Sequence, residues 1–225
     1  MKTLALLLKK DLLLEFRNRE TIALVFCLAL LLAVLASFGV HSAFLDPQTT
    51  RSIFPMVLWM VFIFAATVSI GRSFEFELEN SAIEGLILTQ VSPQLIFVSK
   101  FIGSFVILAI AFVFCLISLA LLLNIEIAPE LGALSLISFE VLFAYSALST
   151  LVSALAGTAR LKSLLLPLLL LPLIIPIFLG ALELTSVAFE QPAQFYGSAW
   201  LSMLGGIDLI YFVAGLVLYG YALRD

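Results

Sequence analysis

Two acidic residues interrupt long apolar runs of this sequence and are its strongest candidates for chemistry at membrane depth. Glu140 lies in the apolar run 131–157, and Asp208 lies in the run 201–223. A carboxyl group enclosed by lipid needs a partner or a water-filled cavity, so it is a functional candidate by default. Glu140 has an alternative, because a span that starts at this residue would leave it at the outer interface. Asp208 has less room, since only the 15 residues Leu209–Leu223 follow it in its run.

Other residues with catalytic or ligating chemistry are scarce. The sequence has one histidine, His41, and two cysteines, Cys27 and Cys115, which both fall inside apolar runs and are typical of core packing. One histidine cannot build a multi-histidine zinc or haem site, and at the end of a span it is more often interfacial than a ligand. No G-x-x-x-x-G-K-[ST] motif occurs, so any nucleotide is hydrolysed elsewhere. We predict no catalytic, cofactor-binding or metal-binding residues and no enzyme activity.

The composition indicates what kind of structural element holds these residues, namely helices that span a membrane. Of the 225 residues, 63% are hydrophobic and 12% charged, which excludes a soluble enzyme because a soluble domain of this size cannot hide so much apolar surface. The apolar runs are long and unbroken, which favours spanning helices over the alternating short segments of an outer-membrane barrel. A net charge of −4 argues against nucleic acid as a partner. The sequence therefore predicts an all-α integral membrane protein within lipid.

Hydropathy and charge predict a single membrane domain over 1–225 with six spans. The runs are 21–40, 53–71, 101–123, 131–157, 164–182 and 201–223. In this arrangement ten of the 11 Lys and Arg residues lie on one side, and Arg51 alone lies on the other. The positive-inside rule then places both the N and the C terminus in the cytoplasm. The first apolar patch, Leu4–Leu8, is too short for a cleaved signal peptide.

Two segments between or before the spans carry most of the charge. Residues 1–20 are too charged to span and predict a short helix in the cytoplasmic interface. In segment 72–100, Glu77, Asn80 and Glu84 share one helical face beside an apolar face. An acidic and an apolar stripe between two spans suit docking to a soluble partner. The alternative is a helix that lies on the membrane with its acids in water.

The fifth run contains Pro172 and Pro176 within the stretch LLLPLLLLPLIIPIFLG. Each proline removes a helical hydrogen bond and its ring clashes with the preceding turn, so the run predicts a broken helix. A broken span is typical of a pathway wall or a hinge, because neighbouring groups must satisfy the freed carbonyls. The alternative is that proline is simply more frequent in spanning helices than in soluble ones.

Three stretches, in this order, resemble the haem exporter protein B family. They are KDLLLEFRNRE at 10–20, ENSAIEGLILTQVSPQLIFVSK at 79–100 and LPLLLLPLIIP at 166–176. In the second stretch, Glu84 and Lys100 fall on the family's acidic and closing lysine positions. Ser81 departs from the glycine that is common there, which leaves the shape of that turn in question. The middle motif is shared by many ABC-2-type exporters, so the combination with the first motif carries the resemblance.

The resemblance implies an ABC-2-type permease architecture in a bacterial inner (plasma) membrane. It implies two copies of the chain with two copies of an ATP-binding subunit, together with haem exporter protein C and a small single-span subunit. It also implies that segment 72–100 holds the ATPase-coupling helix with Glu77 and Glu84, that ATP acts through the partner, and that haem for c-type cytochromes is the substrate. Two alternatives stay open: an ABC-2-type exporter of lipid, polysaccharide or drug, and a scaffold that couples ATP hydrolysis to release of a haem-loaded periplasmic chaperone.

Overall fold

The described part of the chain is a bundle of helices without strands. The computed structural model describes residues 2–17, 19–79, 91–157 and 162–222. The helices are α1 Lys2–Arg17, α2 Arg19–Ser42, α3 Pro47–Glu79, α5 Pro93–Leu122, η1 Ala128–Glu130, α6 Leu131–Gly157, α7 Lys162–Glu190, η2 Pro192–Gly197 and α8 Ala199–Ala222, where η marks a 3-10 helix. Six of these helices are long and apolar enough to cross a membrane. The predicted all-α membrane fold is confirmed.

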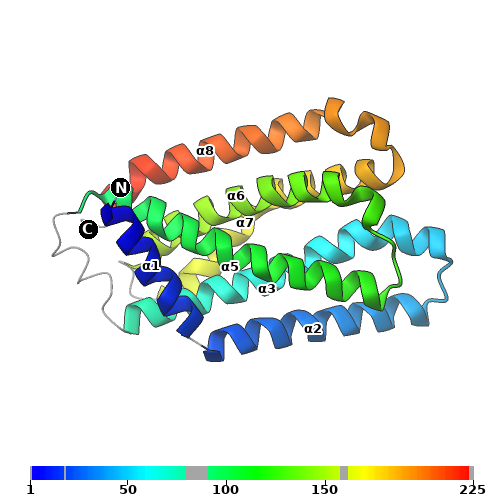
Figure 1. Cartoon of the computed structure of the whole chain (residues 1–225), viewed down its shortest axis with the longest axis horizontal. Coiled ribbons are helices and arrows are strands. Elements are labelled where there is room, and N and C mark those ends of the chain that lie inside the picture. The colour runs from blue at the N-terminus through cyan, green and yellow to red at the C-terminus, as the bar shows by residue number, and fades with distance from the viewer. Residues whose placement is uncertain (1, 18, 80–90, 158–161, 223–225) are drawn as a thin grey trace.

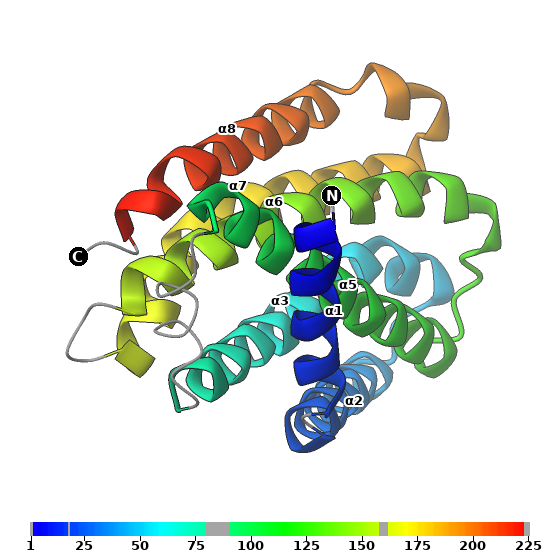
Figure 2. The ribbon, with the colours of Figure 1, turned by 60° about the vertical axis from the view of Figure 1, so that its left-hand side comes forward.

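The spanning helices lie side by side along the long axis of the molecule, and α1 crosses them at one end (Figures 1 and 2). The same end holds both chain termini, together with Arg72 and Lys100, and we call it the basic end. The opposite end carries the exposed acids Asp46, Glu126 and Glu190, and we call it the acidic end. An even number of spans returns the chain to its starting side, as the charge distribution predicts.

The spanning helices extend beyond the predicted apolar runs at several points. The predicted run 53–71 becomes α3, which begins at Pro47 because the Asp46 side chain accepts hydrogen bonds from the backbone N–H groups of Gln48 and Thr49, both at 3.1 Å. The Thr49 hydroxyl also donates to Asp46 at 2.7 Å, and these bonds lower the pKa of the Asp46 carboxyl. Such caps satisfy the unpaired N–H groups at the start of a helix.

Helix α5 also begins earlier than its predicted run, at Pro93 in its first turn. Proline suits this position because its fixed φ favours the helix and its missing N–H has no intrahelical partner there. Residues 93–100, which belong to the predicted cytoplasmic segment, are thus the first turns of a spanning helix.

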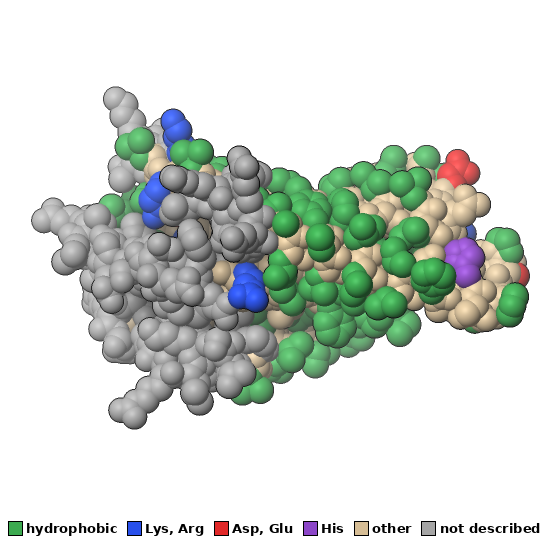
Figure 3. All heavy atoms as spheres, turned by 90° about the horizontal axis from the view of Figure 1, so that it is seen from below, with side chains coloured by type: hydrophobic (Ala, Val, Ile, Leu, Met, Phe, Trp, Pro, Cys, Tyr) green, Lys and Arg blue, Asp and Glu red, His purple; other side chains and the backbone are tan. Residues whose placement is uncertain are grey.

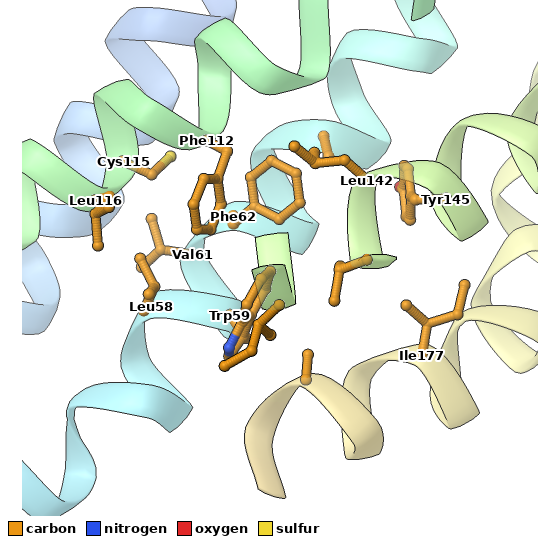
Figure 4. Close-up of a cluster of buried hydrophobic side chains, with 14 of the residues drawn as sticks. Leu58, Trp59, Val61, Phe62, Phe112, Cys115, Leu116, Leu142, Tyr145 and Ile177 are labelled. Atoms are coloured by element: carbon orange, nitrogen blue, oxygen red, sulfur yellow. The ribbon is translucent and has the colours of Figure 1, made fainter. Parts of the chain in front are cut away.

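The core lies between α3, α5, α6 and α7 and is built around a group of aromatic rings (Figure 4). The Trp59 ring stacks on Phe112 with centroids 5.1 Å apart, and Phe62 meets Phe112 edge to face at 5.3 Å. The buried indole N–H of Trp59 donates to the Thr185 hydroxyl at 2.8 Å, and that hydroxyl donates to the Ala181 carbonyl at 2.7 Å. The polar group of the largest core side chain is therefore satisfied inside the bundle, as membrane depth requires.

On the face that Figure 3 shows, hydrophobic side chains predominate along the middle of the molecule. Examples are Leu171 on α7 and Ile210 on α8, which are 55% and 63% exposed. In a soluble protein such a surface would be an aggregation hazard. Around a bundle of this length it is the surface that lipid or another membrane subunit covers.

Helix α8 approaches α5 closely where Gly215 faces Phe97. A Cβ atom at position 215 would lie 2.2 Å from the tip of the Phe97 ring. The ring cannot turn away freely, because it is fully buried and packs against Phe101, Phe212 and Tyr219. The absence of a side chain at position 215 is therefore what allows the two helices to meet.

We expect Gly215→Ala to lower the free energy of unfolding by about 1–3 kcal/mol, because an overpacked core must shift rings and backbone. Gly206→Ala is the matched control on the same helix, since a Cβ atom there meets nothing within 4 Å. Alanine at position 206 should be neutral or stabilising by up to about 1 kcal/mol through its helix propensity. Thermal unfolding of both variants in detergent micelles measures the difference, and equal shifts would contradict the proposed contact.

Candidate functional site

The predicted coupling residues fall at the edge of the described structure. The backbone of Glu77 belongs to the last turns of α3, and Glu84 lies outside the described residues. What the structure does place is the two ends of the segment. Residue 79 ends α3, and Val91 precedes α5, so both helices that flank the segment are spanning helices anchored in the bundle.

Helix α1 docks on the first turns of α5. The hydroxyl of Ser99, which is 1% exposed, donates to the Asp11 carboxylate at 2.7 Å. A Cβ atom at Gly103, one turn further along α5, would lie 3.8 Å from the Asp11 Cβ, so the two helices are in close contact. Lys10 forms an ion pair with the same carboxylate at 3.1 Å. The predicted interfacial helix is therefore attached to a spanning helix by a part-buried hydrogen bond to a charged group.

Helix α7 continues through its prolines without an interruption, and the role of Pro172 and Pro176 as a hinge or pathway wall stays a prediction. The helix extends from Lys162 to Glu190 and includes Pro172 and Pro176. Proline's fixed φ is compatible with helical backbone, and each ring removes one hydrogen bond without removing the turns on either side. Packing of α7 against α3, α6 and α8 then holds the helix together. Pro172 is exposed on the bundle surface and Pro176 is half-buried.

A tyrosine of α8 contacts the backbone of α7 beside these prolines. The Tyr211 hydroxyl donates to the Leu173 carbonyl at 2.8 Å. Leu173 is in the turn between Pro172 and Pro176, where helical hydrogen bonding is weakened. Sequence reasoning missed Tyr211, although a tyrosine inside an apolar run is a signal, because its hydroxyl needs a partner at membrane depth.

The two predicted membrane-depth acids come together in the structure. Glu140 lies within the candidate span Ala128–Leu155 and Asp208 within Ala199–Tyr221, and the two carboxyl groups are close enough to interact electrostatically. Glu140 is half-buried and Asp208 is 9% exposed. Gly205 lies on the same face of α8, and a Cβ atom there would lie 3.6 Å from Oε2 of Glu140. The pair therefore joins α6 to α8 in the interior of the bundle.

The acidic end contains an ion pair that sequence reasoning also missed. The Arg51 guanidinium of α3 donates to the buried Glu130 carboxylate of η1 and lies over the Phe189 ring of α7, 5.2 Å from its centroid. Three elements are thus joined around one cation. The sequence signal was available, because Arg51 is the one basic residue predicted on that side and a buried acid near it needs a counter-charge.

The remaining candidate ligands are dispersed. His41 is exposed at the end of α2, and its Nδ1 lies 2.8 Å from the carbonyl of Ser37 on its own helix. Cys27 is exposed and Cys115 buried, both as free thiols. Within the described ranges, no three His, Cys, Asp or Glu side chains converge as a metal site would require. The polar groups of the bundle instead connect helices to one another.

Comparison with known proteins identifies one family. A family model described as CcmB protein matches residues 1–224. No curated protein matches the chain.

The Asp11–Ser99 contact predicts how firmly α1 is held. Ser99→Ala and Asp11→Asn should each weaken α1 docking by about 1.5–3 kcal/mol, since the first removes the donor of a part-buried hydrogen bond and the second removes the charge of its acceptor. The double variant should cost little more than either single one, because both remove the same interaction. Hydrogen exchange of the α1 amides in detergent measures the effect.

Ser138→Ala is the matched control for these variants. Its hydroxyl bonds only to the Ser135 carbonyl of its own helix, at 3.0 Å, and it is not part of the α1–α5 contact. Exchange in α1 should stay at the wild-type rate in this variant. Additive effects of Asp11→Asn and Ser99→Ala would show that the two side chains act independently.

Proposed function

The chain belongs to the CcmB family, the haem exporter protein B family, and from this premise we propose how it works with its partners. The family implies the membrane permease component of a haem exporter for cytochrome c maturation, within an ABC transporter complex of several maturation subunits. Such a permease is a multi-pass membrane protein and is not itself catalytic. We propose further that it resides in the bacterial inner membrane with its basic end in the cytoplasm, which the distribution of Lys and Arg supports.

Energy for transport comes, in this proposal, from a separate ATP-binding subunit at the basic end. Two copies of the chain would bind two copies of that subunit, with haem exporter protein C and a small single-span subunit beside them. The absence of a nucleotide-binding motif anywhere in the sequence supports this division of work. Haem is the proposed substrate, and no cofactor is assigned to the chain itself.

Segment 72–100 is the proposed site of coupling to the ATPase, with Glu77 and Glu84 as the contact residues. Its position supports this role, because the end of α3 at Glu79 and the start of α5 at Pro93 both lie at the basic end. A displacement of the segment would act on the first turns of α5, where Ser99 holds Asp11 of α1. The motion would thereby reach a spanning helix and the interfacial helix at once.

The strongest support for the transport role is that the family model matches the chain over residues 1–224, which include all six candidate spans. The haem pathway itself can be tested by purification. Haem should copurify with this chain expressed alone if the chain forms part of the pathway, and absorbance of the purified protein measures it. Haem that copurifies only through other subunits would instead favour the scaffold role, in which ATP hydrolysis releases a haem-loaded chaperone.

The coupling role predicts that Glu84→Lys abolishes association with the ATPase, because it reverses the charge of the proposed contact. Membrane insertion should be unchanged. Asp225→Lys makes the same charge change in the C-terminal tail and is the matched control, which should keep the ATPase. Affinity purification of each variant with the coexpressed ATPase measures the retained fraction. Wild-type retention by Glu84→Lys would make the coupling role wrong.

A further inference from the structure

Glu140 and Asp208 are two neighbouring acids, and neither forms an ion pair with a cation of the described residues. With a helical rise of about 1.5 Å per residue, Asp208 lies about 14 Å along α8 from its start at Ala199. That depth is well inside a span, and Leu209 and Ile210 beside it are exposed on the lipid-facing surface. Two ionised carboxylates in contact at such a depth would repel each other strongly.

Two oxygens of the pair lack a hydrogen-bond donor, although the backbone N–H of Ala144 on α6 is close to the Asp208 carboxyl. Oε2 of Glu140 and Oδ1 of Asp208 are both buried, and neither accepts a hydrogen bond from an N–H or O–H group of the described residues. Asp208 as a whole is nine-tenths buried. Buried acceptors of this kind are almost always satisfied in native proteins. A proton between the two carboxyl groups supplies the missing donor and removes the repulsion at the same time.

We propose that Glu140 and Asp208 bind one proton between them, and that this shared proton closes α8 against α6. The proton is carried as an O–H on one carboxyl and accepted by an oxygen of the other, so the pair holds a single negative charge. Pairs of acids in contact share a proton in this way because both cannot ionise together. Loss of the proton to water leaves two carboxylates and drives the helices apart.

The charged groups on the other neighbouring helices lie away from the pair, so the protonation of the pair depends on the two acids themselves. Glu140 is the charged group that acts on Asp208. On α7, Glu183 lies beyond Gly180, which meets Leu204 nearer the start of α8. Helix α5 meets α8 towards the basic end, through Phe97 and the rings around it. From η2, Phe195 and Tyr196 bring aromatic rings.

The same stretch of α8 also holds the proline-containing part of α7. Leu204 meets Gly180 and Tyr211 bonds Leu173, so α7 and α8 are antiparallel and Asp208 lies at the level of Pro176. Deprotonation of the acid pair would therefore loosen α8 at the level where α7 has lost helical hydrogen bonds. In this way the proton bound by the pair controls how closely α6, α7 and α8 pack against one another.

Infrared spectroscopy of the full chain in lipid nanodiscs tests the shared proton directly. The wild type should show the carbonyl stretch of a protonated carboxylic acid at neutral pH and lose it as the pH rises. Asp208→Asn and Glu140→Gln should each remove that band completely, because the amide donates to the remaining carboxylate and no proton is needed. Two independently protonated acids would leave part of the band in each variant, and no change in either variant would show that the pair is ionised. Either result overturns the proposal.

A stability measurement tests the consequence for α8. The midpoint of thermal unfolding of the wild type should fall as the pH rises through the range in which the infrared band disappears, because deprotonation brings two carboxylates together. Asp208→Asn should abolish this dependence, and Glu183→Gln, which removes an acid outside the pair, should retain it. If the pH dependence survives in Asp208→Asn, or disappears in Glu183→Gln, it comes from a group outside the pair. Either result would overturn the proposal.

Discussion

Every polar group that this chain carries into the membrane has to find its partner inside the protein, because lipid offers no hydrogen bonds. The described structure meets much of this constraint with cross-helix contacts, and the buried carboxyl oxygens of Glu140 and Asp208 are exceptions. Thr67 of α3 lies 2.9 Å from the hydroxyl of Tyr145 on α6, in the same core where α3 also bonds to α7 through Trp59. These bonds determine which faces of the helices meet, since an apolar surface alone would pack in many orientations.

The distribution of charge makes the two ends of the bundle different in kind. The basic end carries the helix that docks through Asp11, together with the end of α3 and the start of α5. The acidic end is held by Arg51 and Glu130, a contact that fixes α3, η1 and α7 relative to one another. Between these ends, the acid pair and the prolines lie at one level.

The prolines of α7 show where local reasoning from sequence fails. A proline weakens a helix by a known amount, but whether the helix breaks depends on the packing of its neighbours. Here α3, α6 and α8 enclose α7, and Tyr211 bonds its backbone at Leu173. The acids show the opposite case, because an isolated carboxyl in an apolar run is costly enough to be noticed in the sequence alone. The sequence does not show, however, that Glu140 lies next to Asp208, which is 68 residues away on another helix.

The sequence by itself determined the fold class, the number of spans and the difference between the two ends. These properties depend on hydropathy and charge, which act along the chain and need no knowledge of neighbours. Only the tertiary structure decided that Glu140 meets Asp208, that Ser99 holds Asp11 and that α7 stays helical through Pro176. Lipid offers no hydrophobic driving force for one helix face over another. Pairing is therefore set by the close fit of small residues and by a few buried polar contacts, which no periodicity in the sequence encodes.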